Sequence, residues 1–116
     1  MKDAHGLEVR REARPDGIVV LELAGELTIL TCDRLENAEA DAAGVVVVAY
    51  GLTHVDTPGL ATLVRLATGC AERGGRLALV GLDADIQDLR NHLFLDEAIL
   101  FGDDLEDAVA LVSAAP

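Results

Sequence analysis

The feature that most constrains the fold is a junction between a buried strand and a helix in the middle of the chain. An apolar run rich in Val, from Gly44 to Ala49, leads into it. After it, apolar residues return at helical spacing: Leu60, Leu63, Val64, Ala67 and Ala71. A continuous apolar strand followed by an amphipathic helix predicts a sheet that is covered on both faces, as in α/β domains.

The junction itself reads His54-Val55-Asp56-Thr57-Pro58-Gly59-Leu60. We expect Thr57 to be the N-cap, because its hydroxyl can accept a hydrogen bond from an unpaired backbone N–H of the first turn. Pro58 suits the first helical position, where a missing N–H costs nothing. Gly59 leaves the first turn without a side chain, so that another surface can approach the backbone. The expected result is an exposed hydroxyl at the positive end of a helix dipole, beside the Asp56 carboxylate.

Strands and helices alternate along the rest of the chain, after an opening hairpin. Two strands, 7–10 and 18–24, flank the turn signal Pro15-Asp16-Gly17 and should pair antiparallel, with Gly25 and Glu26 outside the second strand. Further strands are expected at 45–50, 76–80 and 97–101. Helices are expected at about 30–42 (capped by Thr28 or Thr31), 57–73 and 83–94, and from Asp103 onward. This order predicts an α/β domain with a mixed, mostly parallel sheet of about five strands, flanked by about four helices.

Length and charge narrow the possible functions. A chain of 116 residues forms one domain. With 9 basic and 21 acidic residues, its formal charge is −12. Such acidity argues against binding to nucleic acid or to an anionic membrane surface, since both need a cationic surface. A protein partner with a basic face would associate faster, although the same acidity also serves simply to keep a small protein soluble.

The cysteines and histidines give no sign of a cofactor or metal site. Cys32 and Cys70 lie far apart, each in a helical pattern, and are expected to be unpaired core or half-buried residues. No His and Cys cluster has metal-ligand spacing. Met1–Gly6 lacks an apolar signal segment, and no apolar stretch is long enough to span a membrane. We therefore expect a cytoplasmic protein without metal or cofactor.

The junction resembles the signature of a known family. Val55-Asp56-Thr57-Pro58-Gly59-Leu60-Ala61-Thr62-Leu63 is similar to the Asp-Ser/Thr-x-Gly-Leu motif of STAS domains, the domains of bacterial anti-sigma factor antagonists. Leu23–Leu27 resembles the Gly-Glu-Leu segment of the same family. The order of strands and helices is similar as well, so the resemblance covers about Leu7 to Val112. It implies that residues 1–116 form a single STAS-like domain. It implies the STAS fold and a partner that is an anti-sigma factor with Ser/Thr kinase activity.

The resemblance also implies a regulated site. Thr57 stands at the phosphorylated Ser/Thr position of the family. The unphosphorylated chain would bind the kinase and release a sigma factor, and phosphorylation of Thr57 would end that binding. The kinase would supply ATP and the chemistry, so this chain is not expected to be an enzyme. The motif and the neighbouring segment give the expected partner-binding residues: Glu26, Leu27, Thr28, Asp56, Thr57, Pro58, Gly59 and Leu60.

Two positions depart from the family pattern and leave an alternative open. An Asp or Asn commonly stands eight residues ahead of the motif Asp, where this chain has Val48. Gly-Glu-Leu is commonly followed by Asp, where this chain has Thr28. The alternative is a STAS domain without phosphoregulation, which acts as a constitutive binding module or scaffold. A phosphoaspartate receiver site at Asp56 has little support, because it needs an acidic pair for Mg²⁺ and a late Lys that the chain lacks.

Overall fold

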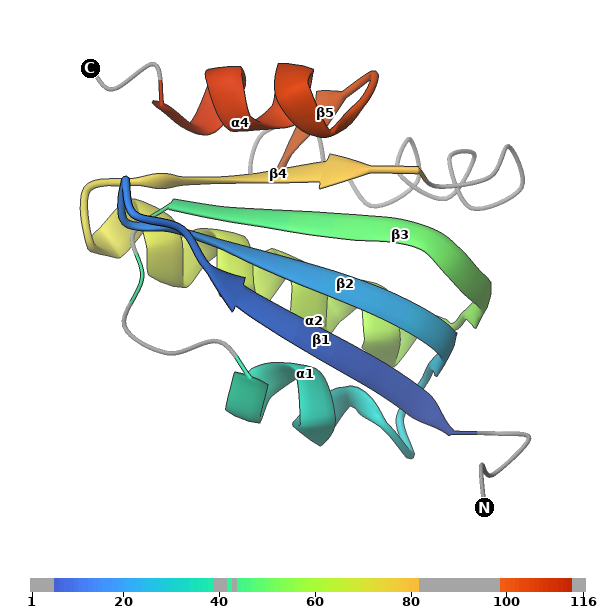
Figure 1. The fold of residues 1–116 in the computed structure, drawn as a ribbon. Coiled ribbons are helices and arrows are strands. Elements are labelled where there is room, and N and C mark those ends of the chain that lie inside the picture. The colour runs from blue at the N-terminus through green and yellow to red at the C-terminus, as the bar shows by residue number, and fades with distance from the viewer. Residues whose placement is uncertain (1–5, 39–41, 43, 82–98, 114–116) are drawn as a thin grey trace.

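The computed structural model describes residues 6–38, 42, 44–81 and 99–113, and in this part of the chain five strands form one sheet (Figure 1). Neighbouring strands follow the order of the sequence, so that each new strand adds to one edge. The first pair is antiparallel and the other three pairs are parallel, which confirms the mixed, mostly parallel α/β sheet. The strands are β1 (Leu7–Ala13), β2 (Ile18–Leu27), β3 (Gly44–Val55), β4 (Arg76–Val80) and β5 (Leu100–Gly102).

Three helices cover the sheet in the described part of the chain: α1 (Cys32–Ala38), α2 (Thr57–Glu72) and α4 (Leu105–Ser113). Helices α1 and α2 pack on one face of the sheet, and α4 packs on the other (Figure 1). The helix expected at 83–94 lies outside the described residues, as do residues 39–41 of the first expected helix. The first helix starts later than expected, at Cys32 rather than Leu30.

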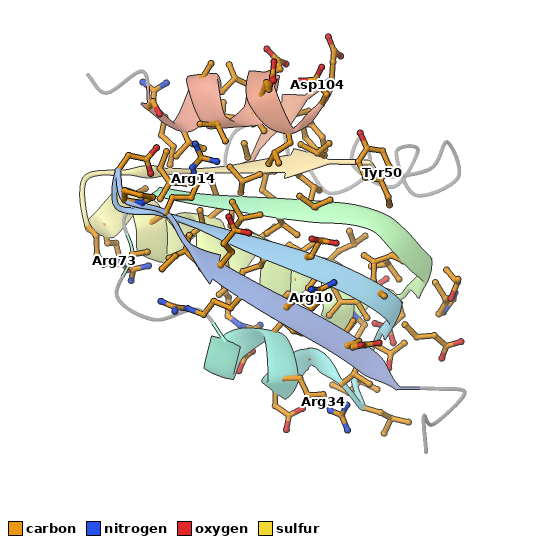
Figure 2. The ribbon with its side chains drawn as sticks, in the orientation of Figure 1. Arg10, Arg14, Arg34, Tyr50, Arg73 and Asp104 are labelled. Carbon is orange, nitrogen blue, oxygen red and sulfur yellow. The ribbon has the colours of Figure 1, made fainter. Side chains whose placement is uncertain are left out.

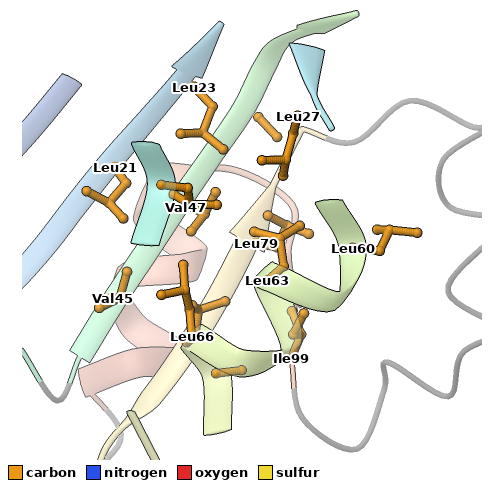
Figure 3. Close-up of a cluster of buried hydrophobic side chains, with 14 of the residues drawn as sticks. Leu21, Leu23, Leu27, Val45, Val47, Leu60, Leu63, Leu66, Leu79 and Ile99 are labelled. Atoms are coloured by element: carbon orange, nitrogen blue, oxygen red, sulfur yellow. The ribbon is translucent and has the colours of Figure 1, made fainter. Parts of the chain in front are cut away.

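Side-chain alternation along the strands divides the core into two layers. In β2, Leu21 and Leu23 face α1 and α2, whereas Val20 faces α4. The larger layer lies between the sheet and α2, where Leu63 and Leu79 are fully buried (Figure 3). Because β3 supplies side chains to both layers, its consecutive Val residues at 45–47 are all buried. This double burial explains the continuous apolar run that the sequence shows at this strand.

The central pair of strands is longer than the sequence predicts. Gly25 and Glu26 do not leave β2, which continues to Leu27 and pairs with β3 as far as Val55. The register shifts between Gly25 and Glu26, where Gly25 adopts a φ of +107°. Such a bulge lets a ladder continue past an irregular residue, whereas a Gly in a sequence reads as a strand end. The extension carries the segments that follow β2 and β3 to the same end of the sheet.

The two cysteines are unpaired, as the sequence predicts. Cys32 is half-buried in α1, and Cys70 is buried in α2. Among the described residues, no helix combines the length and the apolar character that a membrane span needs.

Candidate functional site

The start of α2 and the loop from Thr28 to Thr31 lie side by side at the carboxyl ends of β2 and β3. The Asp56 amide donates a hydrogen bond to the Leu27 carbonyl at 3.2 Å. Gly59 packs so closely on the same carbonyl that a Cβ at Gly59 would collide with its oxygen. The structure therefore brings together the two segments that the sequence predicts to share one site. The surface that approaches the Gly59 backbone is therefore the Leu27 backbone of the same chain.

Asp56, rather than Thr57, is the N-cap of α2. Its backbone is extended, with φ −97° and ψ 178°, and its Oδ1 accepts a hydrogen bond from the Gly59 amide at 2.8 Å. Its Oδ2 accepts a second hydrogen bond, from the Ile29 amide at 3.1 Å. The prediction that Thr57 caps the helix was wrong, because a carboxylate can satisfy the helix and the loop at once. One side chain thus holds the loop against the helix start.

Thr57 is the first residue of α2, and Pro58 follows it in the first turn. Thr57 is exposed, and its hydroxyl makes no hydrogen bond to any residue that the structure describes. It lies at the positive end of a helix of 16 residues. Thr57 is therefore accessible, and no hydrogen bond among the described residues uses its hydroxyl.

The loop displays two aliphatic side chains, with Ile29 63% and Leu30 83% exposed. Hydrogen bonds keep this loop in place. The Thr28 hydroxyl accepts from the Leu30 amide at 3.2 Å, and the Thr31 hydroxyl accepts from the Thr28 amide at 3.0 Å. The Thr31 hydroxyl also donates to the Glu26 carbonyl at 2.7 Å. Neither aliphatic residue was predicted as part of the site, because large aliphatic side chains are usually buried and the local sequence carries no signal of their exposure.

A shallow concave surface lies between this loop and the end of β3, and it is lined by Glu26, Thr28, Ile29, Leu30, His54 and Asp56. Three of the predicted partner-binding residues, Glu26, Thr28 and Asp56, belong to it. Leu27, Gly59 and Leu60 are buried: the two Leu side chains support the surface from below, and none of the three residues reaches a partner in this conformation. The described residues contain no group of His, Cys, Asp and Glu that could hold a metal ion.

The two positions that depart from the family pattern have local structural roles. Val48 packs into the smaller core layer beneath α4, and its strand neighbour is Val80. Thr28 holds the loop through the Leu30 amide. Neither position places a carboxylate beside Thr57; in the described structure the carboxylate next to it is that of Asp56.

Solved structures share this fold. An anti-sigma factor antagonist from Mycobacterium paratuberculosis superposes with a TM-score of 0.80 over 97% of this chain and 98% of its own, at 18% identity. The phosphorylated form of the Bacillus cell fate determinant SpoIIAA gives a TM-score of 0.66 over 90% of this chain and 98% of its own, at 15% identity. A sulfate transporter family protein from Wolinella succinogenes gives a TM-score of 0.67 over 86% of this chain and 88% of its own, at 22% identity. At these identities the likeness shows the fold alone.

The sequence itself gives the family. A comparison with curated proteins finds no significant match. A family model described as "Mlab, STAS domain" matches residues 11–102, which is most of the chain. The match includes β2, the junction at Asp56 and the whole of α2. The chain belongs to the STAS domain family.

Proposed function

We propose that this STAS domain is a protein-binding switch of the anti-sigma factor antagonist type. Its partner is an anti-sigma factor with Ser/Thr kinase activity, which the unphosphorylated chain binds and which phosphorylates Thr57. The chain supplies a hydroxyl, and the kinase supplies ATP and catalysis. One observation carries the proposal: an exposed Thr57, whose hydroxyl has no hydrogen-bond partner among the described residues, stands next to an exposed apolar loop that Asp56 fixes in position.

The loop gives the binding surface its apolar contacts. Ile29 and Leu30 are two of the four large hydrophobic side chains that are exposed in the described part of the chain. Glu26 and Asp56 adjoin them on the same concave surface. A partner that fits this surface has an apolar pocket for Leu30 and basic groups around it. The chain's formal charge of −12 speeds association with such a basic face.

Phosphorylation acts on this surface by charge and hydration. A phosphate on Thr57 adds about −1.5 to −2 charges next to the Asp56 carboxylate and close to the apolar loop. Desolvating that charge in an interface is unfavourable, so the affinity for the partner falls. The helix N-terminus stabilises the phosphate in part, and the cap hydrogen bonds of Asp56 remain. The switch therefore changes affinity and leaves the fold intact.

The proposal is tested by binding measurements with each kinase-type anti-sigma factor of the chain's own organism. Thr57→Glu should weaken the complex roughly tenfold or more, which corresponds to about 1.4 kcal/mol, while Thr57→Gln, of the same size without the charge, should stay near the wild-type affinity. Leu30→Ser should also weaken it, because the apolar contact is lost. Equal affinities for wild type and Thr57→Glu, with both proteins folded, would contradict the switch.

The second candidate is a STAS domain that binds its partner constitutively. It is favoured by the packing of the partly buried Val48 against the smaller core layer and by the engagement of the Thr28 hydroxyl within the loop, since both positions are commonly acidic or amide residues in the family. This candidate predicts a stable complex in which Leu30→Ser weakens binding and ATP has no effect.

A further inference from the structure

Strand β1 is an edge of the sheet, and its hydrogen-bonding pattern shows which backbone groups face outward. Arg14 N donates to Ile18 O at 2.8 Å, and Glu26 N donates to Gly6 O at 3.1 Å. With the register of the β1–β2 pair, these bonds assign the even-numbered residues of β1 to the ladder with β2. The odd-numbered residues therefore direct their N–H and C=O groups away from the sheet.

The outward groups differ between the two ends of the strand. At the start of β1, the Leu7 carbonyl accepts a hydrogen bond from Arg34 Nη1 of α1 at 2.9 Å (Figure 2). The outward groups of Val9, Arg11 and Ala13 make no hydrogen bond to any residue in the described part of the chain. Ala13 and Arg11 are also exposed. The second half of β1 is thus an open edge.

The charges along this edge alternate in sign. Glu8, Arg10 and Glu12 share the face opposite the larger core layer, all exposed, and Arg14 follows them at the turn. The segment is also unusual within the acidic chain, since three of the nine Lys and Arg residues stand within 10–14. Residues 7–14 carry three basic and two acidic side chains, so this edge is locally positive by one charge. It is a place where two copies of an acidic chain can approach each other.

We propose that β1 pairs antiparallel with β1 of a second copy, about a two-fold axis at Arg11, to join two sheets into one. Arg10 then faces the partner's Glu12, and Glu12 faces the partner's Arg10. Val9 and Ala13 exchange backbone hydrogen bonds across the interface, and so do the two copies of Arg11. The outer positions, Glu8 and Arg14, also face opposite charges, with Arg14 sharing its guanidinium with Asp16 at 3.4 Å.

The neighbouring registers are less favourable. An axis at Arg10 sets Arg10 against its own copy and Glu8 against the partner's Glu12, and like charges directly opposite are destabilising. An axis at Val9 requires the Leu7 carbonyl to accept a hydrogen bond from the partner strand, although this carbonyl already accepts one from Arg34. The axis at Arg11 sets Leu7 opposite the partner's Pro15, which has no N–H to donate, so the bond from Arg34 remains. Its unfavourable contact is Arg11 with its copy, where both side chains are exposed to water.

This interface leaves the Thr57 surface open. The start of β1 lies beside the end of β2, whose Leu27 carbonyl binds the Asp56 amide at the junction, whereas the axis lies in the second half of β1. Because the two strands run antiparallel, the two Thr57 sites lie at opposite ends of the joined sheet. Dimer formation and partner binding are therefore independent, and each can be tested without the other.

The register gives a charge-swap test by analytical ultracentrifugation over a range of protein concentrations. The wild type should form a dimer whose fraction rises with concentration. Arg10→Glu and Glu12→Arg should each weaken dimerisation roughly tenfold or more, because each sets two like-charged pairs against each other. An equimolar mixture of the two variants should recover the dimer, because every Glu then faces an Arg. Glu72→Arg, an exposed position on α2 with the same charge change as Glu12→Arg, should behave as the wild type.

Hydrogen exchange gives a second readout, of the backbone itself. The amides of Val9, Arg11 and Ala13 should gain protection as the wild-type concentration rises, while the amides of Glu8, Arg10 and Glu12 should not change. A wild type that stays monomeric over its soluble range would overturn the proposal. So would a dimer that Arg10→Glu leaves intact, or a mixture of the two variants that fails to associate.

Discussion

Two helices of this domain begin with the same chemistry, yet only one of them adjoins a candidate site. Asp56 caps α2, and Asp104 caps α4 by accepting a hydrogen bond from the Asp107 amide at 2.8 Å. In α4, the Asp107 carboxylate accepts a hydrogen bond from the Asp103 amide at 2.9 Å, so both hydrogen bonds of this cap join residues at the start of the same helix. In α2, the second carboxylate oxygen of Asp56 reaches the Ile29 amide, 27 residues away. The cap of α4 only starts its helix, whereas the cap of α2 also holds the loop from Thr28 to Thr31 and so forms part of the candidate site.

The residues after the two caps show the same difference. Leu105 begins α4 and is 39% exposed, with no neighbouring loop held in place by Asp104 in the described structure. Thr57 begins α2 beside Ile29 and Leu30, which the second oxygen of Asp56 positions. If the comparison is right, substitutions at the α2 junction should disturb both the helix and the loop, and those at α4 should disturb the helix alone.

The largest expected effect is at the close contact beneath the junction. Gly59→Ala should lower the free energy of unfolding by about 3 kcal/mol, because its Cβ collides with the Leu27 carbonyl and the backbone must shift. Gly69→Ala, on the same helix, is the matched control. Its Cβ meets only the flexible end of Arg73, so Ala should stabilise α2 by up to about 1 kcal/mol. Chemical denaturation measures both, and equal stabilities for the two variants would refute the close packing.

The next effect compares the two caps directly. Asp56→Ala should cost about 2 kcal/mol of unfolding free energy, because it removes a helix cap and the hydrogen bond from the Ile29 amide. Asp104→Ala should cost about 1 kcal/mol, since it removes a cap only. In hydrogen exchange, the Ile29 amide should exchange faster in Asp56→Ala than in the wild type. Unchanged exchange at Ile29 would mean that Asp56 does not hold the loop.

The last comparison separates the two threonines that flank the surface, and it includes the smallest expected effect. Thr31→Val should cost about 1–2 kcal/mol, because Thr31 is 5% exposed and its hydroxyl bonds both the Thr28 amide and the Glu26 carbonyl. Thr57→Val should change stability by less than about 0.5 kcal/mol, because the Thr57 hydroxyl has no partner among the described residues. Thermal denaturation of the two isosteric variants tests this ranking, and a larger loss at Thr57 would show that its hydroxyl supports the fold.

Local patterns predicted the parts of the molecule that local physics determines. The strand at 76–80 and the helix from the junction to about Arg73 follow from hydrophobic periodicity and from the glycines after the helix, and the structure has both. The helix cap was assigned to the wrong one of two adjacent cap-forming residues. The choice depends on the extended backbone of Asp56 and on a bond to Ile29, and neither is encoded in the local sequence.

The exposed loop and the long β2–β3 pair were missed for a related reason. Gly25 and Glu26 look like the end of a strand, but the bulge at Gly25 keeps β2 paired with β3. Leu30 looks like the first apolar residue of a helix, but the Thr28 and Thr31 hydroxyls fold it into a loop. At Gly25, pairing between two strands overrides the local preference, whereas at Leu30 short-range hydrogen bonds from two hydroxyl groups do so.

The most direct test of the central proposal is intact-mass analysis after incubation with ATP and each kinase-type anti-sigma factor of the organism. We expect a single phosphate that maps to Thr57 and is lost in Thr57→Ala. It should remain in Thr53→Ala, a nearby exposed threonine whose hydroxyl donates to the Gly25 carbonyl at 3.1 Å. A phosphate that persists in Thr57→Ala, or a stable complex with such a kinase that transfers none, would contradict the proposed switch.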